Sequence, residues 1–395
     1  MLYNRKINDD LFYVGVSDRT KSVFEGVYPI PNGMSYNSYL MIDEECALFD
    51  TVDLSVVDSF LENLHTALGE RRLSYVIVSH MEPDHSGTLG LLLKLYPDVT
   101  VVASAKAMAM IGQFLGYSPK NAKVVKEMDT LSLGKHVLQF YAAPMVHWPE
   151  VMVTYDATDG TLFSADAFGT FGALDGRLFA DEVDFERDCI DEARRYYTNI
   201  VGKYGTPVKA LLGKAAKLDI KTVCPLHGYV WRDKIDYFVN KYLLWAEYKP
   251  EEEGVCICYA SIYGNTEKVA RVINARLSER GIKSAIVDLT HEHYSVAVAN
   301  CFKYSRAVMA SITYNGAIFT PMRTFLEEYV EHGIQGRRIG IVENGSWAIV
   351  VGDKIRAMLA ECKGTVVIDN TISLRSAASE ETLSQIDGFI DELMK

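Results

Sequence analysis

The chain has 395 residues, a formal net charge of -12 and no low-complexity segment. This length exceeds what one hydrophobic core usually serves, so we expect two domains. The acidic balance and the lack of basic tracts argue against a nucleic-acid-binding protein. The first ten residues lack the apolar core of a signal peptide, and no uncharged run is long enough to span a bilayer, which predicts a cytoplasmic protein with no membrane partner.

Two short apolar runs begin the first predicted domain. Residues 37–42 and 46–50 are joined by an acidic turn at 43–45, a pattern typical of a β-hairpin. A hairpin followed by strands that alternate with helices indicates a mixed sheet. The N-terminal half is therefore predicted to be an αββα sandwich.

The run 80–85 is the most informative stretch of the chain, with the sequence His-Met-Glu-Pro-Asp-His. It follows the predicted strand 73–79 and precedes a helix that opens near residue 86, and α/β sheets usually place their sites at such strand ends. His80 and Glu82 can hold one metal ion while Asp84 and His85 turn toward a second. The alternative is a solvated loop in which Asp84 caps the next helix.

Three further candidate ligands also follow apolar runs. His147 comes after the predicted strand 137–143, Asp166 ends the run 161–165, and His227 closes the strand 221–226. Alone, such a residue is more often a hydrogen-bonded histidine or a turn aspartate than a metal ligand. Together with the run 80–85 they supply four histidines and three carboxylates, which suits two metal ions with Asp166 as a bridge.

A change of composition marks the domain boundary. A predicted helix ends near residues 245–248, and the segment 249–254 contains a proline, three glutamates and a glycine, as expected of an exposed connector. We therefore expect one domain at 1–249 and a second at 254–395.

The second domain opens with a predicted phosphate-binding turn. The apolar strand 255–260 leads into a hydroxyl-rich turn and a helix that continues to about residue 280. The turn can supply hydroxyl groups, while the first amides of the helix point at an anion. The alternative is an ordinary serine-capped helix. The candidate binding residues of this turn are Ser261, Ile262, Tyr263, Gly264, Asn265 and Thr266.

Two later strand ends would border the same pocket. These are the ends of the predicted strands 307–310 and 338–342. Further strands near 284–288 and 365–368 and helices near 321–331, 352–361 and 380–394 complete a five-stranded parallel sheet, expected in the order 2-1-3-4-5. In that order the ends of the first, third and fourth strands surround a ligand. Tyr314 and Trp347 offer flat apolar faces to a ring, although a core position is an alternative for each. The candidate residues of these loops are Ser311, Thr313, Tyr314, Asn315, Gly316, Asn344, Gly345, Ser346 and Trp347.

The seven cysteines are scattered, and an odd count without a secretory signal favours reduced thiols. Cys256 and Cys258 form the only close pair. Because they share one face of a predicted buried strand, the pattern favours core packing over metal binding. The sequence has no Cys-x-x-Cys pair, so a rubredoxin-type iron centre is not expected in this chain.

These motifs and their order resemble those of the flavodiiron proteins. The ligand order resembles the metallo-β-lactamase fold, whose first motif usually carries a histidine where Glu82 stands, and the turn 261–266 is similar to the phosphate loop of flavodoxins, with Tyr263 where many carry threonine. An oxygen donor beside histidines suits iron, but ligand type alone leaves manganese or zinc possible, so the choice of iron depends on the resemblance. The resemblance covers nearly the whole chain.

The resemblance implies a metallo-β-lactamase-like domain with two iron ions and a flavodoxin-like domain with flavin mononucleotide (FMN). One iron would be held by His80, Glu82 and His147, and the other by Asp84, His85 and His227, with Asp166 bridging; His85 is a ligand in some family members only. No catalytic residue beyond these ligands is expected. The irons would reduce dioxygen to water, nitric oxide to nitrous oxide, or both, and the FMN would supply the electrons.

The resemblance also implies partners. A separate rubredoxin would donate electrons to the flavin. A head-to-tail homodimer, alone or paired as a dimer of dimers, would bring each flavin near the irons of the other chain. Two alternatives from other classes remain at this point: a zinc-type hydrolase with a regulatory flavodoxin domain, and a non-catalytic flavin electron carrier. Trp148, Tyr197 and Trp231 are candidates for the surroundings of the metals.

Overall fold

The structure, a computed structural model, describes residues 5–395, so the first four residues of the predicted N-terminal domain lie outside it. The chain divides into two compact units. The first comprises the described residues up to Tyr197 together with Thr206–Leu243, and the second comprises Thr198–Gly205 and Leu244–Lys395. Across residues 5–395, the helices are all too short or too polar to cross a membrane.

The first unit contains two sheets and two small hairpins. The first sheet has the order β1 (Arg5–Lys6), β2 (Leu11–Tyr13), β7 (Tyr39–Met41), β8 (Cys46–Phe49), β9 (Leu73–Val78), β10 (Thr100–Ser104) and β11 (Ala122–Val125). The second has the order β12 (Thr130–Ser132), β13 (Val137–Ala142), β14 (Met152–Asp156), β15 (Thr161–Phe163) and β16 (Thr222–Cys224). The hairpins pair β3 (Val16–Asp18) with β6 (Met34–Tyr36), and β4 (Val23–Phe24) with β5 (Tyr28–Pro29).

The apolar strand sequences explain this architecture. The predicted hairpin is present as β7 and β8, which pair antiparallel, while β9 joins β8 in parallel. Buried side chains from both sheets form one core between them, including Phe49 and Phe163, whose rings stack at 3.6 Å. The αββα sandwich expected from the sequence is therefore confirmed.

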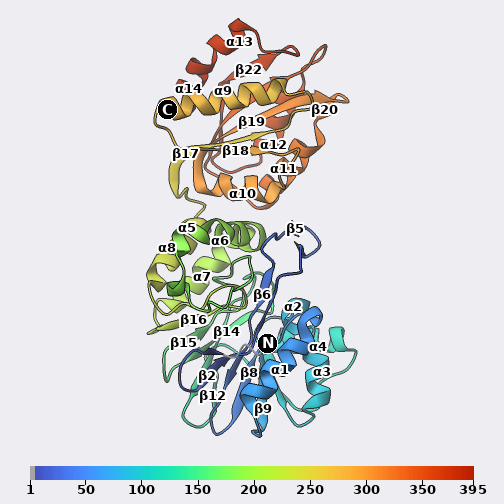
Figure 1. The fold of residues 1–395 in the computed structure, drawn as a ribbon, viewed down its shortest axis with the longest axis vertical. Coiled ribbons are helices and arrows are strands. Elements are labelled where there is room, and N and C mark those ends of the chain that lie inside the picture. The colour runs from blue at the N-terminus through green and yellow to red at the C-terminus, as the bar shows by residue number, and fades with distance from the viewer. Residues whose placement is uncertain (1–4) are drawn as a thin grey trace. The chain divides into compact units, whose positions relative to one another are not determined.

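Helices cover the outer faces of this sandwich (Figure 1). Helix α4 illustrates how sequence sets their ends: Ser104 accepts a hydrogen bond from the amide of Ala107, and Gly116 closes the helix in the left-handed conformation. The helices of this part are α1 (Val57–Leu68), α2 (Pro83–Ser86), α3 (Leu89–Leu95), α4 (Ala105–Leu115), α5 (Phe185–Asp188), α6 (Ile190–Tyr196), α7 (Gly205–Ala215) and α8 (Ile235–Ala246).

The second unit is a doubly wound sheet of parallel strands. The strand order is β18-β17-β19-β21-β22, which is the predicted 2-1-3-4-5, and β20 adds a short antiparallel pairing to β19. The strands are β17 (Glu252–Tyr259), β18 (Ser284–Asp288), β19 (Tyr304–Tyr314), β20 (Ala317–Ile318), β21 (Arg338–Asn344) and β22 (Val366–Leu374). The flavodoxin-like fold expected from the sequence is confirmed.

Both faces of this sheet are covered by helices (Figure 1). Helices α9 and α14 pack on one face, and α10, α11 and α12 pack on the other. The helices are α9 (Asn265–Glu279), α10 (Tyr294–Lys303), α11 (Thr320–Glu331), α12 (Val351–Leu359), α13 (Glu380–Ser384) and α14 (Ile386–Leu393). Alternate residues of β17 thus enter different cores, with Val255 and Ile257 facing α9.

Three differences from the predicted elements have local causes. Strand β17 begins at Glu252, inside the predicted connector, because Glu252 pairs with Tyr304 of β19. The helix predicted at 380–394 is two helices, α13 and α14. The segment Thr198–Gly205 belongs to the second unit, where the Asn199 carbonyl lies 3.0 Å from Nε2 of His332.

Candidate functional site

The run 80–85 changes conformation in its middle. Strand β9 ends at Val78, and Pro83 occupies the first position of the short helix α2. Proline is common at that position because its fixed φ suits a helix. The N–H group that proline lacks would have no hydrogen-bond partner within the helix there. The run is therefore extended only as far as Glu82, and Asp84 and His85 lie on a helical turn instead of the loop expected from the sequence.

The structure brings His80, Glu82, His147 and Asp166 together in one group. Nε2 of His80 lies 3.2 Å from Oε2 of Glu82 and 3.3 Å from Oδ2 of Asp166. Nε2 of His147 lies 3.1 Å and 3.2 Å from the same two oxygens. Four ligand atoms from three separate parts of the chain thus surround one point.

A second group consists of Asp84, His85 and His227. Oδ2 of Asp84 lies 3.3 Å from Nε2 of His85 and 3.2 Å from Nε2 of His227. The other carboxylate oxygen of Asp166, Oδ1, lies 3.2 Å and 3.8 Å from these two nitrogens. Asp166 therefore turns one oxygen to each group, as a bridging ligand would.

The arrangement fits a pair of metal ions. Nitrogen and oxygen ligands at about 2.0–2.2 Å from an ion lie roughly 3.0–3.5 Å from one another, which matches the separations within both groups. Among the described residues, several buried atoms of these side chains have no hydrogen-bond partner, including both Asp84 oxygens and both His85 nitrogens. Buried polar atoms without partners are costly, and bound metal ions would satisfy them.

The charges of the site are strongly coupled. Burial alone would raise the pKa of Asp166, but the facing imidazoles of His85 and His80 hold it well below its ordinary value. Burial opposes protonation of His147, yet Asp166 and Glu82 raise its pKa to about 9. In the metal-free protein Asp166 and Glu82 are therefore ionised and favour the protonated forms of His80 and His147. A divalent cation binds such a site by taking the place of those protons.

Two residues that the sequence analysis missed orient the histidines. Oε1 of the buried Glu150 lies 2.8 Å from Nδ1 of His80, and the carbonyl of Ser35 lies 2.6 Å from Nδ1 of His227. Because a carbonyl only accepts, His227 carries its proton on Nδ1 and leaves Nε2 free for a metal. Only the pairing of remote segments reveals these contacts, although Glu150 lies three residues after a predicted ligand.

We expect Glu150→Gln to weaken metal binding by roughly 10- to 100-fold, since the amide keeps the shape of the side chain but loses the charge that orients His80. Competition with a chelator of known affinity measures the change. Glu127→Gln is the matched control, because Glu127 is an exposed carboxylate of the same unit that pairs with Lys214. Equal affinity of the Glu150→Gln and wild-type proteins would contradict this role.

The three aromatic candidates have different surroundings. The ring of Trp148 lies 5.2 Å from that of His80, beside the first ligand group. Tyr197 and Trp231 pack instead in an aromatic core, at 4.9 Å from Tyr242 and 4.7 Å from Phe185. The neighbour of Tyr197 in sequence, Tyr196, is the one whose ring lies beside His227, at 5.6 Å.

The predicted ligand loops of the second unit border a cavity of about 530 Å³. This volume lies within the range of about 300–1,000 Å³ that is typical of small-molecule sites. Two predicted residues are not among those that line it: Gly264 begins helix α9 with a positive φ, and Ser311 is a fully buried residue of β19. The lining residues are Ser261, Ile262, Tyr263, Asn265, Thr266, Ile312, Thr313, Tyr314, Asn315, Gly316, Asn344, Gly345, Ser346, Trp347, Ala348 and Ser376.

Ser376 is a lining residue that the sequence analysis missed. It follows β22, the fifth strand, which is not expected to border the ligand in a sheet of this order. Its hydroxyl lies 2.8 Å from that of Ser346, and the side chain of Asn344 exchanges hydrogen bonds with its backbone. The loops after β21 and β22 are thereby tied together at the cavity wall.

The two ends of the cavity suit the two ends of FMN. At one end helix α9 has no side-chain cap, so its first amides are available to a phosphate, and Ser261 accepts a hydrogen bond from the amide of Gly264. At the rim Tyr263 and Trp347 are 91% and 94% exposed, and Tyr314 is 44% exposed. Exposed aromatic faces next to an apolar cavity are available to stack on a flat ring.

Comparisons with known proteins divide the chain in the same way. Residues 34–228 match the model of the ODP family beta lactamase, and residues 257–371 match the flavodoxin model. An anaerobic nitric oxide reductase flavorubredoxin of Salmonella paratyphi B is 31% identical over 364 residues, which cover 90% of this chain and 75% of that protein. The flavorubredoxin of Vibrio vulnificus is 29% identical over 90% of this chain and 72% of its own length.

Solved structures match over the whole chain. The rubredoxin oxygen:oxidoreductase of Desulfovibrio gigas superposes with a TM-score of 0.93 and 26% identity, covering 99% of this chain and 98% of that one. The flavodiiron protein of Giardia intestinalis gives a TM-score of 0.94 at 24% identity, over 100% of this chain and 96% of that one. The second likeness concerns the fold alone.

Proposed function

This chain belongs to the flavodiiron protein family and is an oxidoreductase, and on that premise we propose that it reduces dioxygen to water, nitric oxide to nitrous oxide, or both, at two iron ions supplied with electrons by FMN. The observation that carries this proposal is the position of Asp166. One of its oxygens faces the group of His80, Glu82 and His147, and the other faces the group of Asp84, His85 and His227.

The donor set favours iron over zinc. Each group combines imidazole nitrogens with carboxylate oxygens, and no cysteine belongs to either group in the described part of the chain. Glu82 supplies an oxygen within 3.2 Å of two histidine nitrogens, where zinc hydrolases of this fold usually have a third imidazole. Mixed histidine and carboxylate ligands are typical of non-haem iron sites. The ligands, together with the family to which the chain belongs, therefore favour iron over the zinc-hydrolase alternative.

When bound, the irons would pass electrons to the gas and the flavin would restore those electrons. The protein's own residues hold and shield the centre. Glu150 and Ser35 fix two histidines, and the rings of Tyr36 and Phe24 pack edge-on against His227 at 5.8 Å and 5.5 Å. This aromatic wall limits water around the metals, while the half-buried Glu82 lies on the more open side.

The proposed function is tested by reducing the purified protein with light under anaerobic conditions and adding dioxygen or nitric oxide in separate experiments. We expect rapid gas consumption that an electrode records, together with two iron ions and one FMN per chain. The ratio of the two rates gives the preferred gas, which depends on the surroundings of the metals and not on the ligands.

Two results would contradict the proposed function and identify its alternatives. Two zinc ions with no reducible iron would indicate a hydrolase of the same fold. Reversible reduction of the flavin without consumption of either gas, in protein that contains iron, would indicate an electron carrier.

The proposed electron donor is a separate rubredoxin-type protein, because the similar protein of Desulfovibrio gigas is named a rubredoxin oxygen:oxidoreductase. The proposed assembly is a head-to-tail homodimer, in which the exposed rings of Tyr263 and Trp347 at the cavity rim would be covered by the partner. Dilution tests the dimer: turnover per chain is expected to fall as sedimentation shows dissociation. Full turnover by monomers would exclude an essential dimer.

A further inference from the structure

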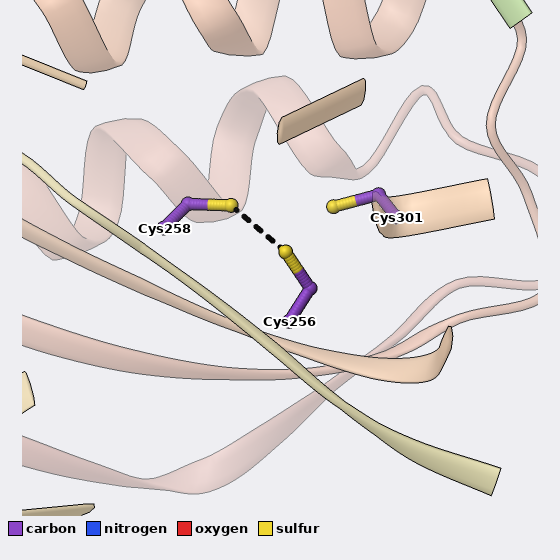
Figure 2. Close-up of side chains that lie close together, drawn as sticks. All are labelled: Cys256, Cys258 and Cys301. Atoms are coloured by element: carbon purple, nitrogen blue, oxygen red, sulfur yellow. Dashed lines mark hydrogen bonds between the residues drawn. The ribbon is translucent and has the colours of Figure 1, made fainter. Parts of the chain in front are cut away.

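Three cysteines converge in the core of the second unit, and none of them lines the flavin cavity. Cys256 and Cys258 lie on the face of β17 that packs against α10, and α10 contributes Cys301. Their sulfur atoms all lie within 4.8 Å of one another, and those of Cys256 and Cys258 are 3.4 Å apart. Figure 2 shows the three thiols pointing toward one common point.

The spacing of the sulfurs fits a shared metal ion. Thiolates bound at about 2.3 Å to one ion lie roughly 3.8–4.0 Å from one another; here two of the sulfurs are 3.4 Å apart and all three lie within 4.8 Å of one another. A disulfide between Cys256 and Cys258 fits less well. Residues two apart on a strand have Cα atoms about 6.6 Å apart, at the upper end of the disulfide range of about 4.4–6.8 Å, and such a bond would leave the third thiol unused.

The buried guanidinium of Arg337 lies next to the three cysteines and would partly balance the negative charge of a metal–thiolate group. Arg337 is 2% exposed, and its guanidinium donates hydrogen bonds only to carbonyl oxygens among the described residues. The acceptors are the carbonyls of Cys301 at 2.8 Å, Phe302 at 3.1 Å, Tyr248 at 2.8 Å and Gln335 at 2.8 Å. No described carboxylate pairs with it, so its charge is left without an anion in the protein interior.

The thiol of Cys301 is the group best placed to supply that anion. The backbone carbonyl of Cys301 accepts a hydrogen bond from Nε of Arg337 at 2.8 Å, so the residue lies next to the guanidinium. The hydroxyl of Tyr329, which is fully buried, has no hydrogen-bond partner in the same region. Polar and charged groups therefore gather around sulfurs that would otherwise be expected to sit in apolar surroundings.

We propose that Cys256, Cys258 and Cys301 form a three-thiolate site for one soft, thiophilic metal ion of the copper(I) class. Thiolates select such ions, whereas the imidazole and carboxylate ligands of the first unit suit harder ones. Binding releases the three thiol protons to solvent, involves no change of oxidation state, and ties α10 to β17. Three thiolates and one monovalent ion carry two net negative charges, of which Arg337 offsets one.

The test titrates the full chain, with its flavin bound, with copper(I) held by a chelator of known affinity under anaerobic conditions. We expect one tightly bound ion per chain, and X-ray absorption at the copper edge should show three sulfur ligands and no nitrogen. Because the thiols are buried, loading requires local opening, so the titration is repeated on protein refolded in the presence of copper(I). A rise in the flavin-detected melting temperature should accompany uptake.

Cys301→Ser is expected to weaken copper(I) binding by at least about 100-fold. Cys362→Ser, which changes a partly exposed thiol of the same unit outside the cluster, should bind as the wild type does. If Cys301→Ser loses its flavin through misfolding, Cys258→Ala is used in its place. The number of sulfur ligands that X-ray absorption shows in the wild-type protein tests the site without any variant. Nitrogen ligation, equal uptake by the variants, or no uptake by either loading route would each overturn the site and leave these thiols as core packing.

Discussion

Replacing Asp166 by alanine should abolish gas consumption and leave the flavin content unchanged. This carboxylate is 1% exposed and faces both ligand groups, so its loss removes an oxygen from each proposed metal ion. It also leaves the imidazoles of His80 and His85 without the charge that balances them. We expect the metal content to fall below one ion per chain and turnover to drop at least about 100-fold. Elemental analysis and electrode measurements check the two effects.

Asp159→Asn is the control for this experiment, because Asp159 precedes the same strand, β15, and accepts hydrogen bonds from Thr161 at the strand's other end. It should keep its metal and its activity. An Asp166→Ala protein that retains two metal ions and wild-type turnover would remove the bridging role and, with it, the observation on which the proposed function depends.

A carboxylate placed in the flavin cavity should abolish FMN binding and leave the metal content unchanged, the reverse of the result expected for Asp166→Ala. Ser261→Asp puts a negative charge where the phosphate of FMN is proposed to bind, next to the first turn of α9. Two unit charges about 4 Å apart near a protein surface repel by about 4 kcal/mol, which weakens FMN binding roughly 1,000-fold. We expect protein that is isolated without flavin, retains both metal ions, and no longer accepts electrons from the donor. Absorption spectra measure the flavin content, and elemental analysis measures the metal content.

Two control variants test whether the loss of FMN binding by Ser261→Asp is caused by the added negative charge. Ser261→Ala removes one hydrogen-bonding hydroxyl and should weaken FMN binding by only about 5- to 10-fold. Ser278→Asp makes the same chemical change at the exposed last turn of α9 and should bind FMN as the wild type does. If Ser261→Asp retains FMN at wild-type affinity, the phosphate does not lie at this turn.

The two substitutions together separate the functions of the two domains. Asp166→Ala is expected to lose metal and keep flavin, and Ser261→Asp to lose flavin and keep metal. When the two variant proteins are mixed, chains that exchange within a homodimer would place an intact flavin beside an intact metal centre. Recovery of part of the activity after mixing is therefore expected of the proposed head-to-tail assembly, and its absence would favour electron transfer within one chain.

The sequence by itself determined the features that are local. A metal-binding run directly after an apolar strand, single ligands at three later strand ends, and a hydroxyl-rich turn before a helix are all visible within a few residues. The strand order of the second domain also followed, because alternating strands and helices admit few arrangements. Each of these predictions depends on the pattern of one short segment and on the rule that sites lie at the carboxyl ends of strands.

Only the tertiary structure decided how remote segments meet. Glu150 on His80 and the Ser35 carbonyl on His227 depend on pairings between strands far apart in the chain. Helix α10 went unpredicted because its valines favour strands as readily as helices. For the same reason, the approach of Cys301 to Cys256 and Cys258 could not be predicted. Long-range packing sets these contacts, and no local pattern in the sequence encodes it.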